Sequence, residues 1–284
     1  MKNILVLSFM HECPLILKEF ELLKEHYNKI IDYFCFPIRY YGVRATEEGE
    51  TRIDKENQII WLHTDNIKEY DKSLICKVID CFKFIEESDI EYDVIIKCNT
   101  SSYLNLIILN NLIQKDTENA IYTGQIVCMK NSSIMNFFVR GNCICMYHNH
   151  IHDIITADVE STENEILEEL RDFDRHILEK ADDVIISKIL INNNNLYVKK
   201  CGHVAFDHVT HIIHPIHKIE DVLKVGVICY KMYNISDKKT SLYTKDNLEY
   251  MCPDIVLLKM IINFAEDHYL IDINQNTVDA VYYC

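Results

Sequence analysis

Two adjacent carboxylates, Asp182 and Asp183, are the residues best suited by type and spacing to acid–base chemistry. They precede the apolar run Val184-Ile185-Ile186 and open a helix predicted to extend to about residue 190. A positioned carboxylate can accept the proton of a hydroxyl as that oxygen attacks another atom. Aspartates also suit a helix N-terminus locally, because they cap free N–H groups and complement the helix dipole. From these residues alone both interpretations stay open.

A second candidate is the junction from Tyr92 to Asn105, where an apolar strand at about 92–97 runs into small polar residues. The strand ends at Lys97, and a helix is expected at 103–114. The polar residues between them are Asn99, Thr100 and Ser101. Open α/β sheets bind ligands outside the carboxyl ends of their strands, where free N–H groups and a helix N-terminus favour phosphate. We therefore expect a ligand-binding turn here.

Gly124 and Gly141 are two of only six glycines, and both lie inside apolar strand patterns. Glycine weakens a strand unless the backbone must approach another group closely or form a bulge. A ligand and a bulge are therefore both consistent with these positions.

A histidine cluster at His148, His150 and His152 superficially resembles the His-x-His-x-Asp-His signature of metallohydrolases. The order differs, because His152 stands where Asp is needed and Asp153 where His is needed. On a strand the three histidines would share one face, whereas on a helix only His148 and His152 would. A hydrolase built on this cluster is a third functional hypothesis.

Composition narrows the class of protein. The 284 residues are 49% hydrophobic and 26% charged, which is typical of globular proteins, and the net charge of -15 argues against sequence-independent nucleic-acid binding. The apolar run 4–10 is too short for a signal peptide or a membrane span. Twelve cysteines without a leader favour reduced thiols and a cytoplasmic location, and Cys143 and Cys145 would point to one face of a strand as a buried structural pair.

The elements that must position these residues alternate in the first half of the chain. Strands are expected at 3–9, about 30–36, 58–63 and 92–97, and helices at about 14–27, 71–88 and 103–114. Later elements are apolar runs at 120–124 and 137–146, helices from about 147, at 181–190 and at about 253–265, and strands at about 196–200 and 223–230. The alternation predicts an α/β domain over 1–284, with a mostly parallel central sheet, helices on both faces and a smaller mixed C-terminal part.

The order of these motifs resembles the beta-1,3-glycosyltransferase and fringe superfamily, whose fold is the GT-A nucleotide-sugar transferase fold. The resemblance covers roughly residues 70 to 200. It rests on the strand that ends at Lys97 with its polar turn, on Tyr122-Thr123-Gly124, on the run from Arg140 to Met146, and on Asp182-Asp183-Val184. It implies a nucleotide-sugar-binding half at about 1–120 and an acceptor and catalytic half at about 121–284.

The resemblance also implies roles for single residues. Asp183 would be the base and Asp182 a supporting residue. The donor would contact Lys77, Lys97, Asn99, Thr100, Ser101, Gly124, Arg140 and Gly141, with Lys199 or Lys200 as further candidates. His208 could be a metal ligand or a phosphate contact. Ser187 stands where the family often has glycine.

One departure concerns the metal. The family's Lys-x-Asp-Asp-Asp motif places aspartates where this chain has Asn99, Thr100 and Ser101. Manganese and magnesium prefer carboxylate oxygens, so either basic side chains neutralise the donor diphosphate or transferase activity is lost.

The first functional hypothesis is therefore an inverting glycosyltransferase that moves a sugar from a nucleotide sugar, most simply a UDP-sugar, to a saccharide or lipid-linked saccharide. Manganese or magnesium would be a possible cofactor despite the missing aspartates. The alternative is a non-catalytic protein that binds a glycan or a nucleotide sugar. Neither hypothesis includes nucleic acid or an integral membrane segment.

Overall fold

The computed structural model describes residues 1–10, 13–47, 49–63, 74–116, 123–128, 137–169, 181–194, 210–213, 229–232 and 253–271. Its strands are β1 (Ile4–Met10), β2 (Ile38–Thr46), β3 (Arg52–Asp54), β4 (Ile59–His63), β5 (Val94–Asn99), β6 (Ser102–Leu104), β7 (Thr123–Cys128), β8 (Phe137–Tyr147), β9 (Thr210–Ile213) and β10 (Cys229–Met232). Its helices are α1 (Pro14–Phe34), α2 (Leu74–Glu87), α3 (Leu106–Lys115), α4 (His148–Thr156), α5 (Val159–Glu169), α7 (Asp182–Asn194) and α11 (Pro253–Ile271).

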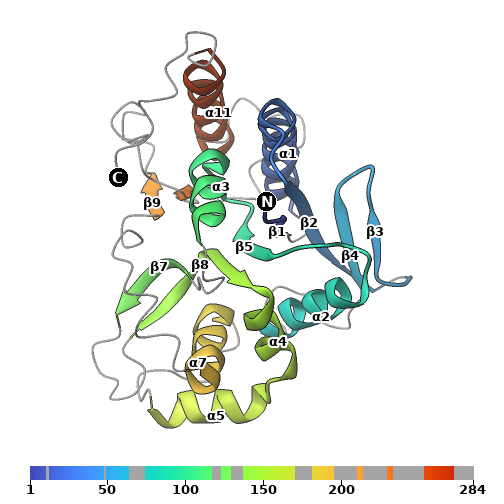
Figure 1. The fold of residues 1–284 in the computed structure, drawn as a ribbon, viewed down its shortest axis with the longest axis vertical. Helices are drawn as coiled ribbons and strands as arrows, with labels where there is room; N and C mark the ends of the chain where they lie inside the picture. The colour runs from blue at the N-terminus through green and yellow to red at the C-terminus, as the bar shows by residue number, and fades with distance from the viewer. Residues whose placement is uncertain are drawn as a thin grey trace.

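A seven-stranded mixed sheet forms the centre of the fold, in the order β3-β4-β2-β1-β5-β8-β7 (Figure 1). The four strands β4, β2, β1 and β5 are parallel, whereas β3, β8 and β7 each pair antiparallel with a neighbour. The expected α/β class with a parallel centre is confirmed, and the GT-A type stays a prediction.

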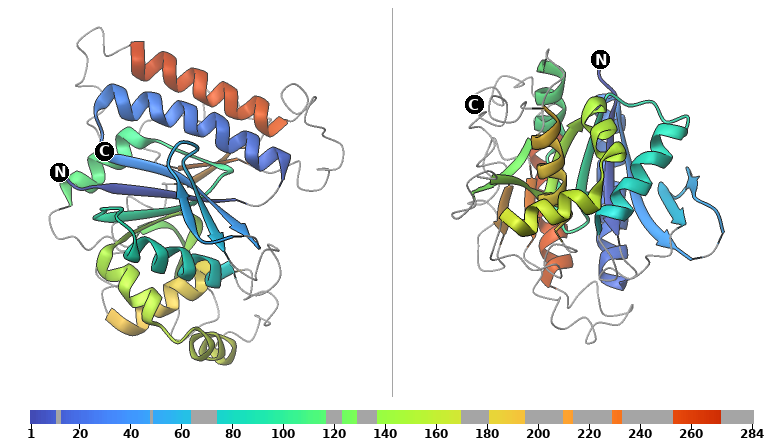
Figure 2. Two further views of the ribbon diagram at one scale, coloured as in Figure 1. Left: turned by 90° about the vertical axis from the view of Figure 1, so that its right-hand side faces the viewer. Right: turned by 90° about the horizontal axis from the view of Figure 1, so that it is seen from below.

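Helices cover both faces of this sheet, and the alternation of side chains along the strands explains why (Figure 2). Ile4 and Val6 of β1 pack with α1, α3 and α11, while Leu5 and Leu7 pack with α2, α4, α5 and α7. Successive side chains of a strand point to opposite faces, so a nearly continuous apolar strand needs cover on both sides. Two buried cores therefore sandwich the inner strands.

The two halves expected on either side of residue 120 share this sheet. β7 and β8 come from the second half, and β8 pairs directly with β5 of the first half. The described residues also include a three-stranded mixed sheet in the order β6-β10-β9, which joins residues from both halves.

The strand predicted at about 30–36 is wrong. Helix α1 continues to Phe34, because Leu23, Tyr27 and Ile30 recur at helical spacing and are buried. The helix ends at Cys35, whose φ of 51° is left-handed, and the strand follows only at β2.

The helix predicted at 103–114 begins later than expected. Residues Ser102–Leu104 form the short strand β6, which pairs with β10. Helix α3 then starts at Leu106, and the Asn105 Oδ1 accepts a hydrogen bond from the Ile108 N–H at 3.3 Å. Asn105 is therefore a structural cap.

Two strands predicted late in the chain can be compared with the structure only in part. The strand expected at 196–200 lies outside the described residues. Of the strand expected at 223–230, only Cys229 and Tyr230 are described, and both belong to β10.

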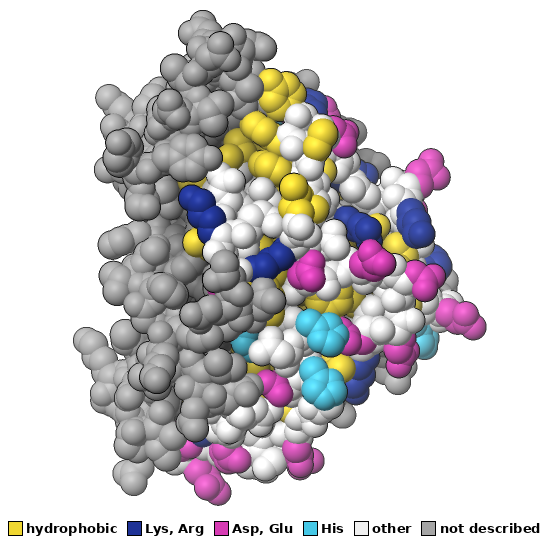
Figure 3. Space-filling view, in the orientation of Figure 1, with side chains coloured by type: hydrophobic (Ala, Val, Ile, Leu, Met, Phe, Trp, Pro, Cys, Tyr) yellow, Lys and Arg dark blue, Asp and Glu magenta, His cyan; other side chains and the backbone are white. Residues whose placement is uncertain are grey.

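Cys143 and Cys145 lie on β8 and are both buried in the core that α1 covers, as the pattern predicted. No helix in the described ranges is long and apolar enough to cross a membrane. On the described part of the face shown in Figure 3, basic and acidic side chains are interspersed, and the basic ones do not form a single large patch.

Candidate functional site

The candidate site lies at the carboxyl ends of β1 and β5. From β1 the chain passes through α1 to β2 on one side, and after β4 it returns through α2 to β5 on the other side. The strand order thus reverses between β1 and β5, and such a switch point is where open α/β sheets bind ligands. The last paired residues at this point are Phe9 and Asn99.

Strand β8 extends the site beyond the end of β5. It runs antiparallel to β5, and its last pair at this edge is Cys98 with Cys143. Residues 137–142 therefore project past β5, where they meet the N-terminus of α7. The Ser187 Oγ of α7 accepts a hydrogen bond from the Val139 N–H at 3.1 Å, which fixes helix and strand against each other.

A buried ion pair forms the base of the site. The Lys97 Nζ lies 2.5 Å from the Asp182 Oδ2, and the two side chains are 1% and 5% exposed. That oxygen makes no aligned hydrogen bond with any described residue, so the contact is one of charge and proximity. The Lys97 Nζ also lies 5.9 Å from the centre of the Phe9 ring. Because Lys97 is enclosed in this way, it serves as the counter-charge of Asp182.

Asp183 lies beside this pair and keeps part of its surface exposed. Its Oδ2 accepts a hydrogen bond from the Gly141 N–H at 2.9 Å, and its Oδ1 accepts one from the Val184 N–H at 3.0 Å. Burial, and then the neighbouring Asp182 charge, raise the pKa of the Asp183 carboxyl above its usual value, against the opposing effect of these N–H groups and Lys97. A raised pKa makes Asp183 a stronger base than an ordinary aspartate.

Gly141 is favoured by this geometry. A Cβ at this position would lie 3.3 Å from the Lys97 Nζ and 3.5 Å from the Asp183 Oδ2. The backbone of β8 thus approaches Lys97 and Asp183 closely, and a methyl group here would displace the Lys97 ammonium by a few tenths of an ångström. The close approach predicted for Gly141 is directed at the protein's own charged groups.

Gly124 lies at an irregularity of the β7 and β8 pairing. Thr123 pairs with Cys145 and Gln125 pairs with Arg140, so β8 advances five residues while β7 advances two. The difference is three residues, and because side chains alternate between faces with a period of two, β8 residues on the two sides of the irregularity use opposite alternation. Gly141 therefore faces α7 together with Val139, whereas Ile144 and Met146 occupy that face farther along.

The polar turn after β5 is mostly enclosed. Thr100 and Ser101 are buried, and Asn99 is half-buried. Of the three turn residues predicted to contact a donor, Asn99 offers the most exposed side chain.

The other predicted residues are not joined to this cluster by any described contact. Lys77 is half-buried in the first turn of α2. Arg140 occupies β8 next to Gly141, but its side chain lies outside the described residues, as do Lys199, Lys200 and His208.

The histidine cluster lies on helix α4. The exposed His148 Nε2 lies 3.0 Å from the Glu86 Oε2, and the buried His150 Nδ1 accepts a hydrogen bond from the Tyr147 N–H at 3.2 Å. His152 is exposed on the same helix. Among the residues described, no group of three or more His, Cys, Asp or Glu side chains could hold a metal ion.

The pairing of Lys97 with Asp182 was not predicted from the sequence, which assigned Lys97 to the donor. The signal available was a lysine inside an apolar strand, since a buried cation needs a counter-charge. No family model matches this chain, and the search of curated proteins also found no match. The site is therefore interpreted from its own chemistry: a partly exposed carboxylate of raised pKa, held at the ligand-binding edge of a parallel sheet.

Proposed function

We propose that this protein is an inverting glycosyltransferase, with a nucleotide sugar as donor and a saccharide as acceptor. The observation that carries the proposal is Asp183, which combines a raised pKa, partial exposure and a fixed orientation at the sheet's switch point. The order of motifs that resembles the fringe superfamily supports the same assignment.

In the proposed reaction an acceptor hydroxyl lies within hydrogen-bond reach of Asp183. As its oxygen attacks the anomeric carbon, the proton passes to the Asp183 carboxylate, and the bond to the nucleoside diphosphate breaks on the opposite face. The Gly141 N–H orients the carboxylate throughout. Lys97 and Asp182 provide a neutral support, because their charges offset each other.

The described residues of the polar turn do not fit a manganese or magnesium site. Asn99, Thr100 and Ser101 contain no carboxylate, and two of the three are buried. We therefore assign no step to a metal and expect neutralisation of the diphosphate by N–H groups and basic side chains, with Lys77 and Arg140 as candidates.

The test compares Asp183→Asn with Asp32→Asn, an exposed control on α1. Each variant is assayed with a panel of UDP-sugars, neutral oligosaccharide acceptors and EDTA. Asp183→Asn should lower transfer about 10²–10⁴-fold while donor binding is retained, because a general base is removed. The control should keep normal activity. Near-normal transfer by Asp183→Asn, or an absolute need for manganese, would contradict the proposal.

A second candidate is a non-catalytic protein that binds nucleotide sugars or glycans, and the missing carboxylates at 99–101 favour it. It predicts that UDP-sugars raise the melting temperature of the wild-type protein without transfer or donor hydrolysis. The same assay therefore separates the two functions.

A further inference from the structure

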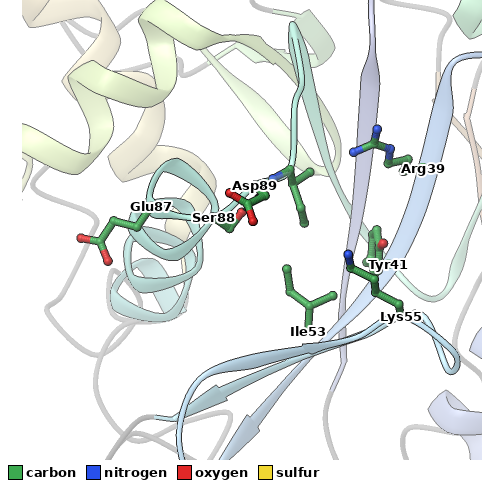
Figure 4. A pocket seen from close by; sticks show the side chains of 8 residues that line it. Arg39, Tyr41, Ile53, Lys55, Glu87, Ser88 and Asp89 are labelled. Atoms are coloured by element: carbon green, nitrogen blue, oxygen red, sulfur yellow. Dashed lines mark hydrogen bonds between the residues drawn. The ribbon is translucent and has the colours of Figure 1, made fainter.

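A cavity lies at the amino edge of the main sheet, on the face that α2 covers (Figure 4). Its volume is about 560 Å³, within the range of small-molecule sites. Tyr41, Ile53 and Ile90 provide an apolar lining, and all three also contact the core beneath α2. The six residues of β5 place this edge about 20 Å from the candidate catalytic edge.

Opposite charges line two sides of this cavity. In Figure 4, Arg39 of β2 and Lys55 in the turn after β3 point toward it, and Asp89 lies across it after the end of α2. Glu87 also borders the cavity, but its carboxylate points away from it in Figure 4. Within the described part of the chain none of these four side chains makes a hydrogen bond or ion pair, so their capacity to bind other groups is unused.

The arrangement of charge selects the ligand. A simple anion would meet Asp89 and the negative carbonyl end of α2, whose last turn contains no basic residue. A simple cation would meet Arg39 and Lys55. A neutral polyol can instead accept hydrogen bonds from the basic side and donate them to the acidic side. A sugar ring adds an apolar face that can lie against the Tyr41 ring.

A neighbouring cavity extends the site. It has a volume of about 150 Å³, and Pro37, Glu91 and Arg39 contribute to its lining. Arg39 thus borders both cavities, with a carboxylate available on each side of it, Asp89 in one cavity and Glu91 in the other. Two cavities that share Arg39 suit a ligand of more than one ring.

We propose that this amino-edge cavity binds a neutral oligosaccharide, as a site separate from the candidate catalytic centre. The inference rests on the cavity alone and does not require that the protein be a transferase. If both proposals hold, the cavity would retain a long saccharide while another part of it reacts at the opposite edge.

The test is saturation-transfer NMR on the full chain with neutral trisaccharides of glucose, galactose, mannose and N-acetylglucosamine. At least one trisaccharide should bind, and Asp89→Asn and Arg39→Gln should each weaken it about tenfold, because each removes a charge-assisted hydrogen bond. Lys83→Gln, an exposed change on α2 outside the cavity, should leave binding unchanged.

The outcomes distinguish this proposal from the proposed function. Asp183→Asn should abolish transfer and leave trisaccharide binding intact. The cavity proposal is overturned if no trisaccharide binds, or if Asp89→Asn and Arg39→Gln bind it as the wild type does. It is also overturned if the cavity binds glycine betaine, a small molecule with one charge of each sign, and does not bind the trisaccharides.

Discussion

Helix α7 contributes to two buried lysine pairs that differ in what surrounds them. Near its N-terminus, Lys97 of β5 pairs with Asp182, and farther along the helix Lys188 lies 2.6 Å from the Glu169 Oε1 of α5. Both lysines are almost fully buried, at 1% and 2% exposure. Each pair has a further carboxylate beside it: Glu165 lies 3.5 Å from Lys188 and is a second partner of that lysine, whereas Asp183 lies beside the first pair and has a raised pKa.

The difference teaches that a buried ion pair is not by itself a sign of function. Lys188 joins α5 to α7, and its partners Glu169 and Glu165 are 16% and 46% exposed, so water reaches part of this group. Lys97 and Asp182 have no such access, and together they allow a second carboxylate to stay beside them. The extra carboxylate with a perturbed pKa marks the functional candidate.

The largest expected effect is loss of the Lys97 charge. Lys97→Met should lower the free energy of unfolding by about 3–5 kcal/mol, because Asp182 would remain buried without its counter-charge. Lys188→Met should lower it by only about 1 kcal/mol, since its partners are partly solvated. Urea unfolding of both variants measures the two values. Equal losses would show that the two pairs do not differ as their exposure suggests.

Gly141→Ala should lower the free energy of unfolding by about 1–3 kcal/mol, because the new methyl group crowds Lys97 and Asp183. It should also change the Asp183 titration followed by NMR. Gly42→Ala is the matched control, since its Cβ would meet Met10 and Phe20 instead. That variant should lose stability and leave the Asp183 titration unchanged.

The two aspartates should respond oppositely to amide substitution. Asp182→Asn should lower the free energy of unfolding by about 1–2 kcal/mol, less than the loss of Lys97 does, because the neighbouring Asp183 carboxylate still offsets part of the Lys97 charge. Asp183 has a folded pKa above its unfolded one, so the unfolded chain releases its proton first and stability falls as pH rises above 3.8. Asp183→Asn removes that loss and should raise the melting temperature at pH 7. Destabilisation by both variants would make Asp183 a structural residue.

The smallest effect concerns a third buried pair, His26 with Glu266. The His26 Nδ1 lies 3.0 Å from the Glu266 Oε1, and its Nε2 lies 3.1 Å from the Tyr103 hydroxyl. Burial lowers the pKa of His26 below 6.5, although Glu266 opposes the shift and nearby Lys29 adds to it. The unfolded chain then takes up the proton first, so stability should fall as pH drops below 6.5.

His26→Gln should flatten this part of the stability curve, measured by urea unfolding between pH 5 and 8. His152→Gln, an exposed change on α4, serves as the control and should leave the curve as in the wild type. An unchanged slope in His26→Gln would assign the pH dependence to other groups.

The spacing of apolar residues correctly predicted helices and strands that bury one regular apolar face. It failed where the end of an element depended on backbone conformation or on pairing with a distant strand. Helix α2 was expected at 71–88 and is observed at Leu74–Glu87. The end of α1 was misplaced, because residues 30–36 are apolar except for Asp32, and such a run suits a helix as well as a strand. The helix ends only at Cys35, whose backbone is left-handed. Strand β6 was missed, because its pairing with β10 joins residues more than 120 positions apart.

By itself the sequence determined the α/β class, the two covered faces of the sheet and the carboxylates that open α7, since these depend on local pattern and residue type. Only the tertiary structure decided that Lys97 neutralises Asp182 and that the Gly141 N–H binds Asp183. It also decided that Arg39 and Asp89 line the same cavity from opposite sides. The reason is physical. A pattern fixes which face a side chain occupies, whereas charge pairing depends on strand register and on the β8 irregularity, which bring distant residues within a few ångströms.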